Sequence, residues 1–204
     1  MSFDIFDTLI LRRCSPRDVF SIAEKKYNAQ HGDTLCTFRH DRVNAELRAR
    51  SKSTREDITL GEIYRELADV YGTEKAGELK AMELEAEFEA VYPNDELREF
   101  YGLVREQGRR VVITSDMYLP GNTIAGMLGR CGYDGYDRLY VSSDFGLSKR
   151  KGGLFRFMLW ESGVKASEIV HIGDNLLSDY LAPKKYGIRG FLYGGSSSLK
   201  EQGI

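Results

Sequence analysis

The second half of the chain alternates between short apolar runs and amphipathic, helix-like stretches, and this alternation limits the possible folds more than any other feature. Strands that are connected through helices pair in parallel, so the pattern predicts an α/β fold built on a doubly wound parallel sheet. The alternating strand and helix segments, in chain order, are 111–114, 124–128, 139–141, 154–159, 169–172, 176–186 and 188–193.

The first half contains one short apolar run at its start and otherwise shows helix patterns. Thr59 with Glu62 predicts a capping box at a helix start, and the stretches around it carry apolar residues at helical spacing. The chain turns back toward the sheet after a Pro-Asn break. We therefore expect a catalytic core made of residues 1–12 and 93–204, with residues 13–92 inserted as an all-helical cap.

Two of the predicted strands end in carboxylates. Asp4 follows the first apolar run, and Asp174 follows Gly173 at the end of the run at 169–172, with Asp179 soon after. The carboxyl ends of parallel strands meet at one sheet edge, where open α/β sheets bind their ligands. A carboxylate in that place can act as a nucleophile or as a metal ligand.

A hydroxyl and an ammonium group lie between these acidic segments in the chain. Ser115 ends another apolar run, and Lys149 precedes a helix pattern. Oxygen ligands such as Asp4, Asp174 and Asp179 suit Mg²⁺. Ser115 can donate to a phosphate oxygen while Lys149 neutralises negative charge. Together these residues predict magnesium-assisted phosphoryl transfer.

These residues resemble the haloacid dehalogenase superfamily of aspartate-nucleophile hydrolases, and the resemblance covers nearly the whole chain. FDIFDT resembles the first motif, with Asp4 as nucleophile and Thr8 as its threonine. VVITSD is similar to the second, where we favour Ser115 as the catalytic hydroxyl and assign Thr114 beside it to substrate binding. SKRKGGLF resembles the third, with Lys149 at the expected spacing, and GDNLLSD matches the fourth, GDxxxxD.

The resemblance implies several properties of the protein. An insertion after the first strand resembles the family's first cap type, which closes over the site and selects the substrate, so we expect a small phosphorylated metabolite. The pattern also resembles a bacterial branch often found beside or fused to glycosyltransferases. The linker-like run at 194–198 agrees with a domain related to a longer, glycosyltransferase-containing protein.

Phe6 departs from the family pattern. The family's phosphatases carry a second aspartate there, which acts as general acid and base, and phenylalanine cannot transfer a proton. Its backbone carbonyl can still complete a magnesium site with Asp4 and Asp174, while Asp179 supports the metal or the lysine. General acid catalysis contributes about 10² to 10⁴-fold in rate, so we expect good leaving groups to be favoured. Asp7 is the candidate substitute acid.

Two rival functions remain open. The family's dehalogenases also have an aromatic residue at the position of Phe6, but they use no metal, so the pair Asp174 and Asp179 favours a phosphohydrolase or phosphotransferase. A catalytically weakened domain that binds a phosphorylated ligand or a partner is the third reading, because fold alone does not settle function.

Some charged residues fit more than one role. Arg42 could contact a substrate phosphate, although its spacing from Glu46 and Arg50 is also typical of ion pairs along a solvated helix face. Asp116 is assigned to the substrate site, where it either positions Ser115 and Lys149 or caps the next helix. Lys151 is the second candidate for the motif lysine.

Composition narrows the class of protein. With 204 residues, 42% hydrophobic residues and a formal net charge of -2, the chain can bury a core but has no general attraction for nucleic acid. Its three cysteines are widely spaced, which suits reduced thiols in the cytosol. Neither a membrane-spanning run nor a signal peptide is recognisable, and we expect a cytoplasmic enzyme.

Overall fold

The computed structural model describes residues 1–194 and shows a five-stranded, fully parallel sheet. The linker-like run predicted at 194–198 lies outside the described residues from 195 onward. The strand order is β5-β4-β1-β6-β7, so the chain winds from the central strand β1 first to one side and then to the other. This confirms the predicted α/β class. The strands are β1 (Ser2–Phe3), β4 (Val112–Ser115), β5 (Arg138–Val141), β6 (Val170–Gly173) and β7 (Arg189–Leu192).

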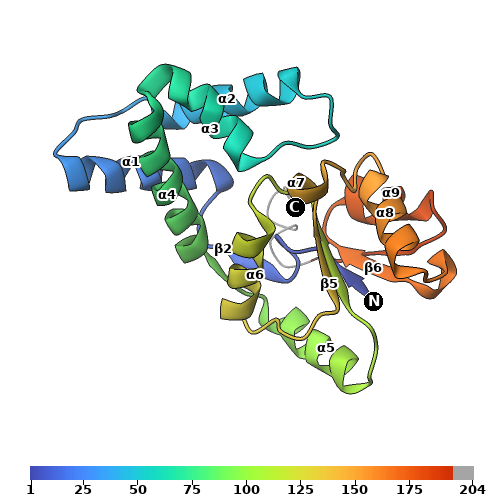
Figure 1. The fold of residues 1–204 in the computed structure, drawn as a ribbon. Coiled ribbons are helices and arrows are strands. Elements are labelled where there is room, and N and C mark those ends of the chain that lie inside the picture. The colour runs from blue at the N-terminus through green and yellow to red at the C-terminus, as the bar shows by residue number, and fades with distance from the viewer. Residues whose placement is uncertain (195–204) are drawn as a thin grey trace, which may run out of the picture.

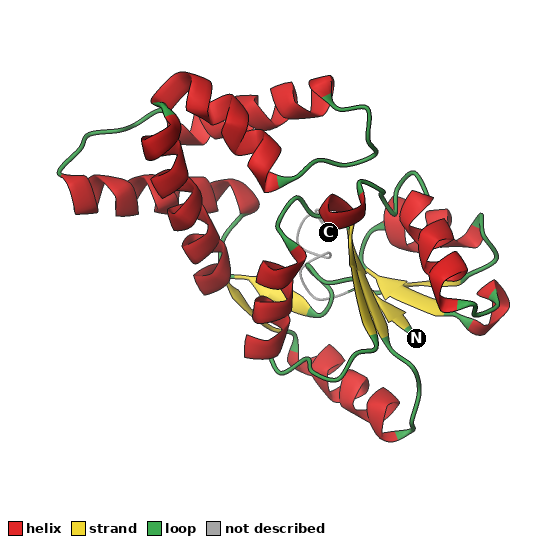
Figure 2. Cartoon of the chain, viewed as in Figure 1, coloured by secondary structure: helices red, strands yellow, loops and turns green. Residues whose placement is uncertain are grey.

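Helices cover both faces of this sheet (Figure 2). On one face the ring of Phe3 packs against Phe100 and Tyr101 of α5, with centroid distances of 6.2 and 5.9 Å. On the other, Tyr140 packs edge-on against Phe157 of α8. The core helices are α5 (Asp95–Glu106), α6 (Gly121–Arg130), α7 (Ser142–Phe145), α8 (Gly153–Ser162), the short 3₁₀ turn η1 (Ala166–Glu168), the π-helix η2 (Leu176–Leu181) and α9 (Ala182–Lys184).

Four helices lie between β2 (Ile10–Arg12) and β3 (Val91–Pro93), and these two strands pair with each other in antiparallel fashion (Figure 1). Thr59 and Glu62 form the predicted capping box at the start of α3. We propose that this helical group is the cap, joined to the core through the β2–β3 ribbon. Its helices are α1 (Pro16–His31), α2 (Phe38–Lys52), α3 (Leu60–Tyr71) and α4 (Thr73–Ala90).

Two details differ from the sequence-based expectation. The predicted helix at 176–186 is divided into the π-helix η2 and the short α9, and Asn175 caps its start by accepting the N–H groups of Leu177 and Ser178. The β2–β3 ribbon was not predicted, since three-residue strands show no recognisable alternation. No helix within residues 1–194 is both long enough and apolar enough to cross a membrane.

Candidate active site

The register of the three central strands brings the motif residues to one edge of the sheet. Phe3 of β1 pairs with Ile113 of β4 on one side and with Ile172 of β6 on the other. Asp4 therefore follows β1 at the level where β4 and β6 also end. On one side of Asp4, β4 ends at Ser115. On the other side, β6 ends at Gly173 and is followed directly by Asp174.

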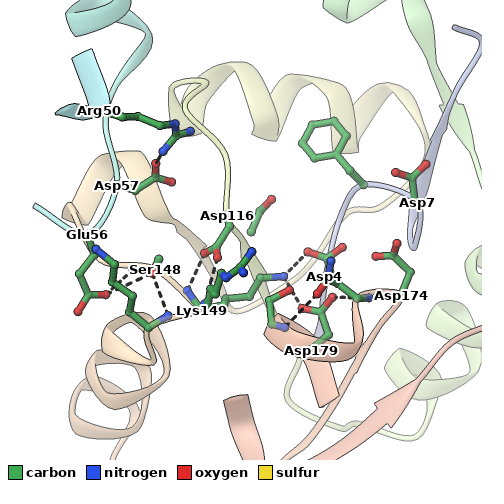
Figure 3. Close-up of a pocket in the computed structure, with 16 residues that line it drawn as sticks. Asp4, Asp7, Arg50, Glu56, Asp57, Asp116, Ser148, Lys149, Asp174 and Asp179 are labelled. Atoms are coloured by element: carbon green, nitrogen blue, oxygen red, sulfur yellow. Dashed lines mark hydrogen bonds and ion pairs between the residues drawn. The ribbon is translucent and has the colours of Figure 1, made fainter. Parts of the chain in front are cut away.

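A pocket of about 420 Å³ opens at this edge (Figure 3). That volume lies within the range of small-molecule sites. Both the core and the helical insertion contribute to its wall. The lining residues are Asp4, Phe6, Asp7, Arg50, Glu56, Asp57, Ser115, Asp116, Ser148, Lys149, Arg150, Lys151, Asp174, Asn175, Ser178 and Asp179.

Three carboxylates meet at one end of the pocket. Asp4, Asp174 and Asp179 each offer an oxygen, and these oxygens lie within 4.8 Å of one another. Burial, together with the neighbouring acids, raises the pKa of Asp4 to about 8 and that of Asp174 to about 6, against the opposing attraction of Lys149. Asp7 adds to the shift of Asp174, and Figure 3 shows their carboxylates close together. A divalent cation would relieve this repulsion.

The donor set therefore fits Mg²⁺, which prefers carboxylate and carbonyl oxygens. One oxygen of Asp4 accepts from Lys149, while its other oxygen and Asp174 share a weak donor, the Thr8 hydroxyl, at 3.3 and 3.5 Å. Both oxygens of Asp179 accept hydrogen bonds, three in all. This difference favours Asp4 and Asp174 as ligands, with Asp179 acting on Lys149. Phe6 lines the pocket, and the role of its carbonyl as a ligand stays a prediction.

Lys149 lies buried between two of the acids. Its ammonium group donates to Asp4 and, at 2.6 Å, to Asp179, and these charges raise its pKa although burial opposes them. Asp179 is fixed in turn by His171, whose Nε2 lies 3.1 Å away, and the Ser2 hydroxyl lies 2.9 Å from His171 Nδ1. His171 is fully buried, and both of its ring nitrogens have a polar partner. Its contact with the partner of the lysine was not predicted from the sequence, because it joins residues whose side chains meet only in the fold.

The backbone of the lysine loop is held by carboxylates from elsewhere. Asp116 accepts the N–H groups of Lys149 and Arg150 at 2.6 and 3.1 Å, which favours the positioning role over helix capping. Glu56, from the loop between α2 and α3, accepts the Ser148 N–H at 2.8 Å. Sequence reasoning missed Glu56, because nothing local marks a loop acid that reaches across to another loop.

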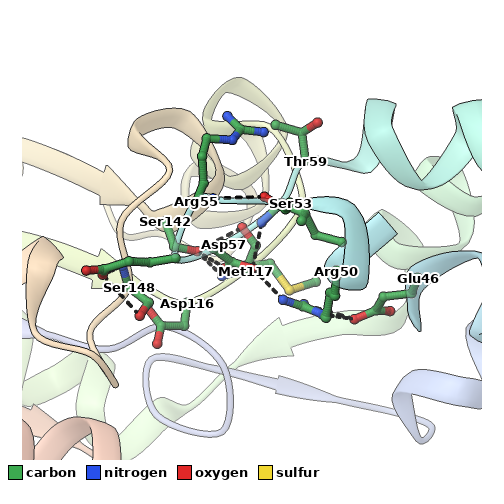
Figure 4. A network of polar contacts seen from close by, with 12 residues as sticks. Glu46, Arg50, Ser53, Arg55, Asp57, Thr59, Asp116, Met117, Ser142 and Ser148 are labelled. Atoms are coloured by element: carbon green, nitrogen blue, oxygen red, sulfur yellow. Dashed lines mark hydrogen bonds and ion pairs between the residues drawn. The ribbon is translucent and has the colours of Figure 1, made fainter. Parts of the chain in front are cut away.

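A second contact joins the helical insertion to the core (Figure 4). Arg50 on α2 donates to Asp57 at 2.7 Å and to Glu46 at 2.9 Å. Asp57 in turn accepts from the hydroxyl of Ser142, which lies at the end of β5, and that hydroxyl also accepts the Met117 N–H at 2.8 Å. Arg50 and Asp57 therefore close one side of the pocket.

Three residues assigned to substrate binding lie outside the pocket wall that the described residues form. The prediction for Arg42 is wrong, because its buried guanidinium forms a double hydrogen bond with Glu83 of α4 at 2.8 and 2.9 Å. Thr114 is buried on the opposite side of β4 from Ser115, as strand alternation requires. Thr8 is buried beneath Asp4 and Asp174 and supports these acids instead.

The sequence matches the model of the haloacid dehalogenase-like hydrolase family over residues 2–187. The chain belongs to this family. A curated relative, haloacid dehalogenase-like hydrolase domain-containing protein 3 of Danio rerio, is 36% identical over 78 residues. That match covers 38% of this chain and 32% of the relative, so it spans only about a third of the relative's length.

Solved structures share the fold at low sequence identity. A 2-haloacid dehalogenase from Pseudomonas syringae pv. tomato has a TM-score of 0.72 at 17% identity and covers all of this chain and 86% of its own. A HAD phosphatase from Thermococcus onnurineus has a TM-score of 0.63 at 17% identity, and the match covers 96% of this chain and 86% of the phosphatase. A magnesium-bound putative HAD-hydrolase from Bacillus subtilis has a TM-score of 0.61 at 17% identity, and the match covers 92% of this chain and 84% of that protein.

Proposed function

We propose that this chain is a magnesium-dependent phosphohydrolase or phosphotransferase that forms an aspartyl-phosphate on Asp4 from a small phosphorylated metabolite. The observation that carries the proposal is the arrangement of the buried Asp4 and Lys149 beside the half-buried Asp174 at one end of a small-molecule pocket. Both dehalogenase and phosphatase neighbours share the fold, so the function must be argued from the residues. The additional carboxylate of Asp174 beside the nucleophile favours a cation and a phosphate.

Each residue has a definite task in the proposed reaction. The Asp4 carboxylate attacks phosphorus, Lys149 holds Asp4 and neutralises charge on the phosphate, and Ser115 donates to a phosphate oxygen. Bound Mg²⁺ would supply further charge neutralisation between nucleophile and phosphate. Water, or another acceptor, then takes the phosphoryl group from Asp4. Phe6 cannot protonate the leaving group, so that group departs as an anion unless Asp7, which also lines the pocket, supplies the proton.

Phosphate release in Mg²⁺ from acetyl phosphate, para-nitrophenyl phosphate and a sugar phosphate tests this proposal. We expect turnover of the first two only, and its loss in Asp4→Asn. Asp69→Asn, at an exposed position on α3, is the matched control and should retain activity. Asp7→Asn tests the substitute acid without straining the backbone, because Asp7 has φ 57 and asparagine also tolerates that conformation.

The outcomes separate the rival functions. Turnover of the sugar phosphate that is lost in Asp7→Asn would identify Asp7 as the acid. Chloride release from a 2-chloro acid without added metal would replace the proposal with a dehalogenase. Binding of phosphate esters without turnover of any substrate would instead establish a binding domain.

A further inference from the structure

Two cations in the pocket have no carboxylate partner among the residues that the structure describes. Arg150 and Lys151 follow the motif lysine, line the pocket and are exposed, and within residues 1–194 neither has a carboxylate oxygen within 4.0 Å. Arg50 lines the same pocket but is neutralised by Asp57 and Glu46. Arg150 and Lys151 therefore remain available to an anionic ligand.

The surrounding acids are already committed to holding the backbone of this loop. Asp116 accepts the N–H of Arg150, Glu56 accepts the N–H of Ser148, and the Ser148 hydroxyl accepts the N–H of Lys151 at 3.1 Å. These bonds fix the positions from which the two cationic side chains extend. A binding group on a fixed backbone loses less entropy when it orders a ligand.

Two adjacent positive charges suit a phosphate group, which carries nearly two negative charges, better than they suit a carboxylate, which carries one. Lys149 is occupied by Asp4 and Asp179, so it serves the phosphoryl group that is transferred. Arg150 can bind two oxygens of a second phosphate through its planar guanidinium group, and Lys151 supplies the second charge.

The missing acid at Phe6 points independently to the same substrate class. A phosphate leaving group has a second pKa of about 6, so it departs as a stable anion at neutral pH. An alkoxide from a sugar phosphate would need a proton that Phe6 cannot give. A second phosphate therefore suits both the two cations, which have no carboxylate partner among residues 1–194, and the lack of an acid at position 6.

We propose that the substrate is a phosphoanhydride, such as a nucleoside diphosphate, and that Arg150 and Lys151 bind its leaving phosphate. This inference rests on the proposed function. A bond forms between Asp4 and the terminal phosphorus, the bridging P–O bond breaks, and its electron pair stays on the departing phosphate without protonation. Water then attacks the aspartyl-phosphate, which restores the Asp4 carboxylate and releases inorganic phosphate and a proton to solvent.

The test compares ADP with acetyl phosphate, whose leaving group carries no phosphate, in Mg²⁺. Arg150→Gln/Lys151→Gln should lower kcat/KM for ADP roughly 100-fold, because each charge-assisted contact contributes about tenfold. The same variant should change kcat/KM for acetyl phosphate less than about threefold. The control Arg156→Gln/Lys165→Gln removes equal charge from exposed positions outside the pocket and should leave both values unchanged.

The two substrates distinguish a failure of the phosphate subsite from a failure of the proposed function. Hydrolysis of acetyl phosphate without hydrolysis of ADP, or an equal loss on both substrates in the double variant, would overturn the phosphate subsite and leave the proposed function standing. Failure to turn over either substrate would overturn both. Thermal unfolding of all variants confirms that exposed substitutions leave the fold intact.

Discussion

The buried pair of Arg42 and Glu83 should stabilise the helical insertion and take no part in ligand binding. Both side chains are 0% exposed, and the guanidinium donates to both carboxylate oxygens of Glu83. It also lies over the rings of Phe20 and Tyr118, 4.6 and 4.8 Å from their centroids. Arg42→Met would leave the buried Glu83 carboxyl group with the Tyr64 hydroxyl as its one remaining partner within residues 1–194.

Removing one member of a buried ion pair costs about 3–5 kcal/mol. For a chain of this length each kcal/mol shifts Tm by roughly 2–4 °C, so Arg42→Met should lower Tm by roughly 6–20 °C. Arg42→Met/Glu83→Leu removes both charges and should recover most of the loss. Tyr64 then keeps an acceptor, because its hydroxyl also donates to the Leu79 carbonyl at 3.2 Å.

Thermal and urea unfolding of wild type, the two single variants and the double variant would give the coupling free energy directly. Kinetics should be measured well below the lowest Tm. A loss of tenfold or more in kcat/KM for Arg42→Met, with unchanged stability, would refute the structural assignment and return Arg42 to the substrate site. If the double variant loses as much unfolding free energy as the two single variants together, the two side chains are not coupled and the ion-pair explanation is refuted.

Three further predictions follow from the site and the insertion. A Cβ on Gly173 would lie 2.5 Å from Cγ of Asp179, so Gly173→Ala should lower kcat/KM with acetyl phosphate at least tenfold, whereas Gly77→Ala, with open space around it, should not. At 100 times its Kd, Mg²⁺ should raise the unfolding free energy by about 2.7 kcal/mol, and Asp174→Asn should abolish that gain in a calorimetric scan. Burial raises the pKa of Glu87, the attraction of Arg12 lowers it, and the repulsion of Glu83 raises it further. Glu87 therefore binds its proton more tightly in the folded protein than in the unfolded chain. The contribution of Glu87 to stability should therefore fall as pH rises above about 4.3. Glu87→Gln should remove this part of the pH dependence in urea titrations, and a pH dependence identical to that of wild type would contradict the prediction.

The sequence predicted the features that depend on local patterns. Alternating apolar segments were sufficient to predict the parallel sheet, and the capping box at Thr59 follows from the side-chain chemistry of four consecutive residues. The convergence of Asp4 and Asp174 followed from topology, since parallel strands end at the same edge.

The features that sequence reasoning missed depend on packing between distant segments. Arg42 was expected on a solvated helix face, and its ion pair with Glu46 does form at 3.2 Å, but α4 covers that face with Glu83. Glu56 reaches the lysine loop across 92 positions of sequence. A pattern read along one helix or loop carries no information about which element packs against it.

The β2–β3 ribbon has a consequence for how this fold can vary. The chain leaves and re-enters the core at paired positions, since Leu11 lies opposite Tyr92. The distance that any inserted segment must span is therefore fixed by one strand pair and is independent of the insert's length or architecture. Inserts of different size could be exchanged at this junction by recombination while the sheet edge and its catalytic residues keep their geometry.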